Sequence, residues 1–172
     1  SNYDTCIFRV ATACGAEVLF YSTHACGRLL GPVFEFEFTQ GTVTFSRYAS
    51  GTSAEVTAKF QDGSQKLYGY PDADGVPTKL WETINAIRGQ GKISCGIETA
   101  MMQTICINAA RQSCPEIKEF PRELVYKMGV PGAQVKVMTG LAEYLEQAYH
   151  SNQMLAEVCA ESWVQPGKVV SC

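Results

Sequence analysis

The residues with the most evident chemistry lie in one short segment near the N-terminus. His24 follows a β-rich run and is itself followed by Ala25, Cys26, Gly27 and Arg28. An imidazole and a guanidinium at the end of a strand, beside a loop that contains glycine, are able to hold substrate hydroxyls or a carboxylate. The alternative is a histidine packed at a sheet edge with Arg28 in solvent, and the residue types alone favour that alternative.

Metal or nucleophile chemistry has weaker support in this segment. His24 and Cys26 lack the second, convergent ligand pair that a zinc site requires. Cys26 beside His24 also has no third group to orient the histidine, as a catalytic thiol needs. The other histidine, His150, follows Tyr149 and is interpreted as an exposed or partly buried helix residue. We therefore expect no catalytic and no metal-binding residue in this chain.

A dinucleotide site is not expected either. Such a site needs G-x-G-x-x-G between a strand and a helix, so that backbone N–H groups and the helix N-terminus meet the pyrophosphate. The nearest match, Gly89-Gln90-Gly91, follows a helical pattern and lacks the third glycine, which indicates a turn. The sequence also has no G-x-S-x-G, P-loop or H-E-x-x-H motif. No cofactor-binding residue is predicted.

The elements that would position His24 are β-strands. Gly15-Ala16 separates two β-rich runs and predicts a hairpin whose second strand ends near His24. Residues 34–38 read Phe-Glu-Phe-Glu-Phe, which is the period of a half-buried antiparallel strand. Strands are expected at residues 4–14, 17–25, 33–39, 42–48, 54–60 and 65–70.

Helices are expected only in the second part of the chain, at residues 78–89, 96–113 and 139–159. The run PDADGVP (71–77) separates them from the strands. Strands followed by helices, without βαβ alternation, indicate the α+β class. We predict an open, mainly antiparallel sheet of about six strands with helices packed on one face. No internal repeat is present, and the length suits one domain over residues 1–172.

The alternation at residues 34–38 predicts two different sheet faces. The phenylalanines would form a core face toward the helices. Glu35 and Glu37, with Thr44 and Arg47 as neighbours, would lie on the uncovered face. An uncovered face that mixes charged and β-branched residues is a common oligomer surface. A solvated face is the alternative.

Composition and charge disfavour several classes of function. The 172 residues carry a formal net charge of −3 and no run of more than two basic residues, so no nucleic-acid partner is expected. No apolar stretch approaches the roughly 20 residues that span a bilayer, and no signal peptide opens the sequence. The eight cysteines form no C-x-x-C pair, and no N-glycosylation sequon is present. Reduced thiols and a cytoplasmic location are therefore expected, with a secreted, disulfide-linked domain as the alternative.

Several segments together form a pattern that extends over much of the chain. They are EVLFYSTH (17–24), FEFEF (34–38), Gln40-Gly41-Thr42, Cys95-Gly96-Ile97-Glu98, NAARQS (108–113) and Lys118-Glu119-Phe120-Pro121. These segments resemble the C-terminal domain of the glucose–fructose oxidoreductase/inositol dehydrogenase (Gfo/Idh/MocA) family. The resemblance covers roughly residues 4–125. It rests on the patterns of strand pleating and side-chain packing rather than on catalytic motifs.

The resemblance implies a parent enzyme that transfers a hydride between NAD or NADP and a sugar, cyclitol or related polyol. Catalysis in the family uses Glu-Lys-Pro and Asp-x-x-x-His motifs, and this sequence contains neither. Those motifs and an N-terminal Rossmann domain are expected upstream of Ser1, so this chain alone is expected to be inactive. The loop with Ser22, His24 and Arg28 corresponds to a part of the family domain that borders the substrate cleft.

The resemblance thus makes Ser22, His24 and Arg28 candidate substrate-binding residues. It also implies two partners: a sugar-like small molecule and a second copy of the chain, bound through the open sheet face. A stand-alone binding or interaction domain of similar fold, without redox activity, is the competing interpretation.

Overall fold

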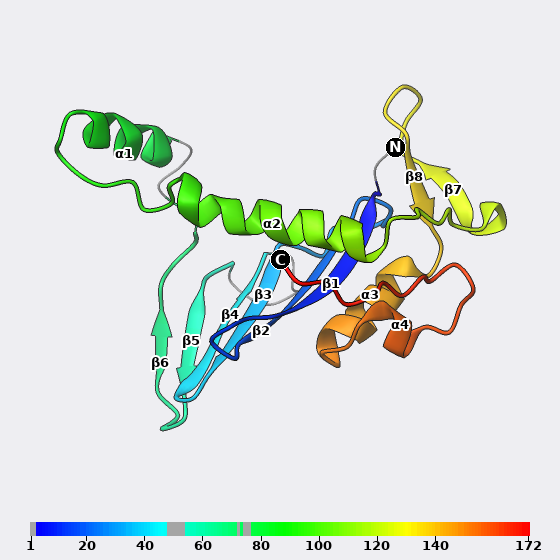
Figure 1. The fold of residues 1–172 in the computed structure, drawn as a ribbon, viewed down its shortest axis with the longest axis horizontal. Helices are drawn as coiled ribbons and strands as arrows, with labels where there is room; N and C mark the ends of the chain where they lie inside the picture. The colour runs from blue at the N-terminus through cyan, green and yellow to red at the C-terminus, as the bar shows by residue number, and fades with distance from the viewer. Residues whose placement is uncertain (1–2, 48–53, 72, 74–76) are drawn as a thin grey trace. The chain divides into compact units, whose positions relative to one another are not determined.

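The computed structural model describes residues 3–47, 54–71, 73 and 77–172. It divides into two compact units. Unit 1 comprises Ser1–Arg28 and Ile97–Cys172, and unit 2 comprises Leu29–Gly96. The single domain expected for residues 1–172 stays a prediction. The mixture of helices and open antiparallel sheets confirms the α+β class (Figure 1).

The described strands of unit 2 form one antiparallel meander in the order β3-β4-β5-β6 (Figure 1). Alternation along β3 places Phe34, Phe36 and Phe38 on one side of this sheet, as predicted, and the register sets Phe34 opposite Phe45 of β4. The strands are β3 (Val33–Phe38), β4 (Gly41–Ser46), β5 (Thr57–Phe60) and β6 (Gln65–Leu67).

The phenylalanine side of this sheet is only partly a core. Phe34 stacks on Phe36 and on Phe45, with ring centroids 4.8 Å and 5.4 Å apart. Phe45 is 5% exposed, whereas Phe36 and Phe38 are 53% and 63% exposed. The prediction that all three β3 phenylalanines are core residues is therefore wrong for Phe36 and Phe38. Their rings leave an apolar surface toward the tip of the β3–β4 hairpin.

The other side of the sheet carries the charged and β-branched residues, as predicted. Glu35 lies opposite Thr44, and Glu37 lies opposite Thr42. Thr42 in turn lies opposite Lys59 of β5, so one row across three strands reads Glu-Thr-Lys. Arg47, which was expected on this side, follows the end of β4, where its backbone N–H donates to the Pro32 carbonyl.

Unit 2 also contains the helix α1 (Pro77–Ile87), which was expected at residues 78–89. It begins at proline instead, because the fixed φ of proline suits the first helical turn, where its missing N–H costs nothing. The strand predicted up to residue 48 and the break predicted at residues 71–77 lie partly outside the described residues.

Unit 1 begins with the predicted hairpin of β1 (Thr5–Ala11) and β2 (Glu17–Thr23). Its turn is closed by Thr12, whose backbone N–H donates to the Ala16 carbonyl. Gly15 has a φ of +85°, a conformation that glycine adopts without steric cost. The hairpin pairs Cys6 with Ser22 and Ile7 with Tyr21, so these pairs face opposite sides.

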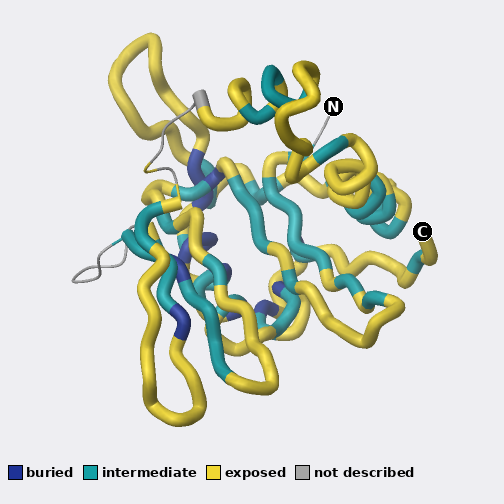
Figure 2. The backbone as a smooth tube through the Cα atoms, turned by 90° about the vertical axis from the view of Figure 1, so that its left-hand side faces the viewer, coloured by how far each residue is buried: buried dark blue, intermediate teal, exposed yellow. Residues whose placement is uncertain are grey.

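The core of unit 1 lies on the Ile7–Tyr21 side of this hairpin. The Tyr21 hydroxyl donates to the carbonyls of Ala148 and Gln153, at 3.2 Å and 2.9 Å. The other elements around this core are α3 (Leu141–His150), α4 (Leu155–Val158), and β8 (Val135–Met138) paired with β7 (Val125–Met128) after the short η1 (Arg122–Leu124). One cluster of buried residues comprises Ala25, Met138, Leu141, Leu145, Leu155, Cys159 and Trp163, and Val137, Ala142 and Ala148 of unit 1 are also buried. Buried residues are dark blue in Figure 2.

The helix α2 (Ile97–Ser113) matches its predicted span. None of its residues is buried. Its last turn holds the C-terminal tail, because the Ser113 carbonyl accepts the Lys168 N–H at 3.0 Å. No helix among the described residues combines the length and the apolar character needed to cross a bilayer.

Two predicted features differ in detail, and one hairpin was missed. The first six strands are hydrogen-bonded as sheets of two and four strands, not as one sheet. The helix expected over residues 139–159 ends at His150 and resumes at Leu155, because Asn152 adopts a φ of 53°, which is incompatible with a continuing right-handed helix. The β7–β8 hairpin was not predicted at all.

Candidate functional site

Among the three candidate residues of unit 1, Ser22 lies within β2, and His24 and Arg28 follow the end of this strand. The β1–β2 ladder continues one step past the strand, since the His24 backbone N–H donates to the Asp4 carbonyl at 2.9 Å. At the last pair of the ladder, the hydroxyls of Thr5 and Thr23 lie 2.8 Å apart. The backbone at His24 is therefore held by Asp4, which directly precedes β1, and by the last pair of the β1–β2 ladder.

The loop after His24 is anchored to the core. Ala25 is 3% exposed, its N–H donates to the Thr23 hydroxyl at 2.9 Å, and its carbonyl accepts the Met138 N–H at 2.9 Å. A Cβ added to Gly27 would lie 3.2 Å from the Tyr126 hydroxyl, so the loop passes close to β7. Buried Ala25 and closely packed Gly27 thus fix the positions between His24 and Arg28.

The His24 side chain is exposed. No hydrogen bond, ion pair or ring contact joins its imidazole to another residue in the described part of the chain. An imidazole on a fixed backbone, with both ring nitrogens uncommitted, is able to donate and to accept a hydrogen bond from a bound hydroxyl. This arrangement is suitable for contacting a polar ligand.

Arg28 is engaged with α3. Its guanidinium donates to the Glu146 carboxylate, and the Arg28 Nη2 to Glu143 Oε1 distance is 3.6 Å. The arginine side chain is 48% exposed, so solvent screens these ion pairs. A ligand carboxylate would have to compete with two glutamates for this guanidinium. The two glutamates would also repel a ligand carboxylate, whereas they do not repel a neutral polyol, whose hydroxyls are weaker acceptors.

Ser22 lies apart from the other two side chains. It is half-buried, and its neighbour Tyr21 faces the core and α3. Since successive side chains of a strand alternate, Ser22 faces the opposite side of the hairpin, together with Cys6. No hydrogen bond or ion pair joins Ser22, His24 and Arg28 within the described residues. The structure brings His24 and Arg28 onto one anchored loop and gives Ser22 no contact with either.

Cys26 lies in the same loop and is half-buried. Burial raises the pKa of the Cys26 thiol, and the nearby Arg28 only partly counteracts this effect. A thiol with a raised pKa is mostly protonated at neutral pH and is a poor nucleophile. The electrostatics therefore argue against a catalytic role for Cys26. Among the described residues, no cluster of three or more His, Cys, Asp or Glu side chains is arranged to hold a metal ion.

The sequence did not point to the two glutamates that bind Arg28. Glu143 and Glu146 are three residues apart in α3 and therefore share one helix face. The sequence shows these two residues as an acidic pair, but it does not show which residue they bind. The contact with Arg28 spans more than a hundred residues, and only the packing of α3 under the β1–β2 hairpin determines it.

Comparisons of this chain with models of protein families, with curated proteins and with solved structures found no match in any of the three searches.

Proposed function

We propose that this chain is the substrate-binding and oligomerisation domain of a cytoplasmic NAD- or NADP-dependent oxidoreductase that acts on a sugar, cyclitol or related polyol. The observation that carries the proposal is His24, an exposed imidazole on a loop anchored by buried Ala25. The α+β fold and the resemblance to Gfo/Idh/MocA C-terminal domains support it. In this proposal His24 and Arg28 contact substrate hydroxyls, while the nucleotide and the catalytic groups belong to another domain.

Substitution of His24 tests the substrate contact. We expect myo-inositol or a related polyol to shift the amide resonances of residues 22–28 in the ¹⁵N-labelled chain. His24→Ala should weaken this binding about tenfold, since it removes a hydrogen-bonding group from a polar site. His150→Ala is the matched control, because His150 is also exposed and lies on α3. An unchanged polyol affinity in His24→Ala would contradict the assignment of His24 as a substrate-binding residue.

The oligomer part of the proposal concerns the Glu-Thr-Lys side of the unit 2 sheet. Glu37, Thr42 and Lys59 form one row across β3, β4 and β5, with the acid and the base on either side of the threonine. Two copies related by a two-fold axis bring the acidic strand of one toward the basic strand of the other. Such a face is complementary to itself.

We expect light scattering to give the mass of a dimer at high concentration. The double variant Glu35→Lys/Glu37→Lys should shift the chain toward the monomer, because every charge in the contact becomes positive. Glu116→Lys/Glu119→Lys changes the net charge equally in an exposed segment of unit 1 and should leave the dimer intact. A wild-type chain that remains strictly monomeric at high concentration would contradict the proposed dimer.

The cytoplasmic location rests on the cysteines. All eight are unpaired in the structure, including the buried Cys159. A count of fewer than eight reactive thiols in the denatured protein would argue for the secreted alternative.

A further inference from the structure

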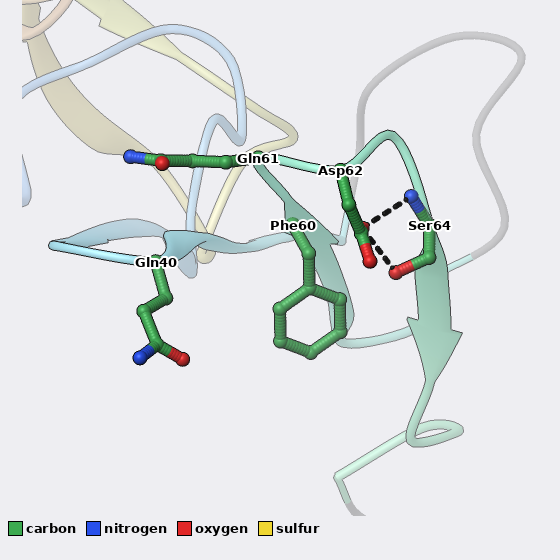
Figure 3. Close-up of a pocket in the computed structure, with 5 residues that line it drawn as sticks. All are labelled: Gln40, Phe60, Gln61, Asp62 and Ser64. Atoms are coloured by element: carbon green, nitrogen blue, oxygen red, sulfur yellow. Dashed lines mark hydrogen bonds between the residues drawn. The ribbon is translucent and has the colours of Figure 1, made fainter.

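A cleft in unit 2 lies where the tips of two hairpins meet. It has a volume of about 380 Å³ and is lined by Gln40, Phe60, Gln61, Asp62 and Ser64 (Figure 3). The two tips are tied together, because the Gln61 N–H donates to the Gln40 carbonyl at 3.0 Å and the Gln61 side-chain amide donates to the Thr39 carbonyl at 2.8 Å. The volume lies at the lower end of the range for small-molecule sites, about 300–1,000 Å³.

An aromatic row with a glycine in the middle adjoins this cleft and shares Phe60 with it. Gly41 pairs with Phe38 on one side and with Phe60 on the other. A Cβ on Gly41 would lie 2.2 Å from the Lys59 carbonyl oxygen, so no side chain fits there. Phe38 and Phe60 are 63% and 39% exposed. The two rings therefore border a hollow on the sheet surface, which is about 100 Å³ in volume and adjoins the cleft.

The polar part of the cleft consists of a carboxylate and an amide on either side of the Phe60 ring. Figure 3 shows the ring between Gln40 and the Asp62–Ser64 pair, with these side chains on the same side of the strands. Ser64 donates its backbone N–H and its hydroxyl to Asp62 Oδ1, at 2.9 Å and 2.6 Å. These bonds hold the pKa of Asp62 below its usual range. Asp62 Oδ2 and the Gln40 amide make no hydrogen bond with other described residues.

The chemistry of this lining selects a neutral polyhydroxylated ligand. A carboxylate accepts hydrogen bonds from hydroxyls, and an amide both donates and accepts. The negative face of an aromatic ring attracts the weakly positive C–H groups of a sugar ring. The lining contains one acid and no base, which disfavours phosphates and carboxylates.

We propose that this cleft is a sugar-binding subsite in which a pyranose ring stacks on Phe60 and its hydroxyls bind the Gln40 amide and the Asp62 carboxylate. The subsite is distinct from the loop at the end of β2, which belongs to unit 1. It does not depend on the oxidoreductase proposal, and a stand-alone binding domain would use it equally well.

Titration of the ¹⁵N-labelled chain with methyl β-D-glucopyranoside tests this subsite. We expect saturable shifts centred on residues 38–43 and 58–64, with a dissociation constant of about 1–10 mM, as suits a small neutral ligand at an open site. Phe60→Ala should weaken binding about tenfold and Gln40→Ala about threefold, through loss of the stacking platform and of one hydrogen-bonding group. Both variants should keep the amide spectrum of the sheet.

The matched controls are Phe36→Ala, an exposed phenylalanine on the same side of the sheet but outside the cleft, and Gln65→Ala on β6. Neither control should change the affinity by more than about twofold. The proposal is overturned if the glucoside gives no saturable shift below about 100 mM, if Phe36→Ala weakens binding as much as Phe60→Ala, or if tetramethylammonium binds at residues 58–64 and the glucoside does not. Shifts confined to residues 22–28 would also overturn it, and would leave the role of His24 standing.

Discussion

Leu141→Ala is expected to lower the free energy of unfolding of unit 1 by about 2–5 kcal/mol, the range measured when a buried leucine is truncated. Leu141 is 0% exposed and belongs to the cluster that also contains Leu145, Leu155 and Trp163. The truncation removes the transfer free energy of the missing atoms and leaves a cavity that packed neighbours fill only in part. Since Ala25 belongs to the same cluster, the variant should also loosen the loop that carries His24.

Tryptophan fluorescence during urea denaturation measures this effect. Trp163 is 7% exposed and lies against Phe120 and Tyr144, with ring centroids 5.4 Å and 6.1 Å away, so its emission reports the core directly. A Trp81→Phe background removes the only other tryptophan. Leu29→Ala is the control, because Leu29 is 73% exposed and its truncation should change stability by no more than about 0.5 kcal/mol. Equal losses in both leucine variants would contradict the assignment of the core.

Gly41→Ala is expected to destabilise the unit 2 sheet by about 1–3 kcal/mol, the cost of overpacking a tight position. The added Cβ would lie 2.2 Å from the Lys59 carbonyl and 3.0 Å from the Phe60 Cα, and both are backbone atoms. The β4 and β5 backbones must therefore move apart where Gly41 pairs with Phe60. The same movement should open the cleft beside Phe60 and weaken glucoside binding there.

Amide hydrogen exchange of β4 and β5 reports this change residue by residue. We expect faster exchange at Lys59 and Gln61 in the variant, since local opening of the ladder becomes easier. The Gln61 N–H donates to the carbonyl of Gln40, next to Gly41, and the antiparallel alternation directs the Lys59 N–H to β4 as well. Gly91→Ala is the control, because a Cβ on Gly91 meets no atom within 4 Å. Unchanged exchange at Lys59 and Gln61 in Gly41→Ala would show that the two strands do not approach each other as described.

The sequence was informative where local pattern and structure agree. The strict alternation at residues 34–38 placed three phenylalanines on one side of β3 and both glutamates on the other, and the register confirms both sides. Gly15-Ala16 located the first hairpin, since a turn with a positive φ needs glycine. Periodicity reports which residues share a face. It does not report what covers that face, and Phe36 and Phe38 are therefore more exposed than the pattern suggested.

The candidate site was less accessible to prediction. The end of β2 at His24 followed from the strand pattern, but the contacts of Arg28 with Glu143 and Glu146 depend on tertiary packing of α3. The hairpin of β7 and β8 was missed because each strand has only four residues, too few for a clear period. The cleft at Phe60 arises from two hairpin tips about twenty residues apart, and no local motif marks their meeting.

The measurement that tests the central proposal most directly is the sequence of the gene upstream of the codon for Tyr3. The proposed oxidoreductase requires, in the same reading frame, a strand–G-x-G-x-x-G–helix unit followed by Glu-Lys-Pro and Asp-x-x-x-His, because the proposal assigns the nucleotide site and the catalytic groups to another domain. A native start codon with no such unit upstream would contradict the redox function and leave a stand-alone binding domain.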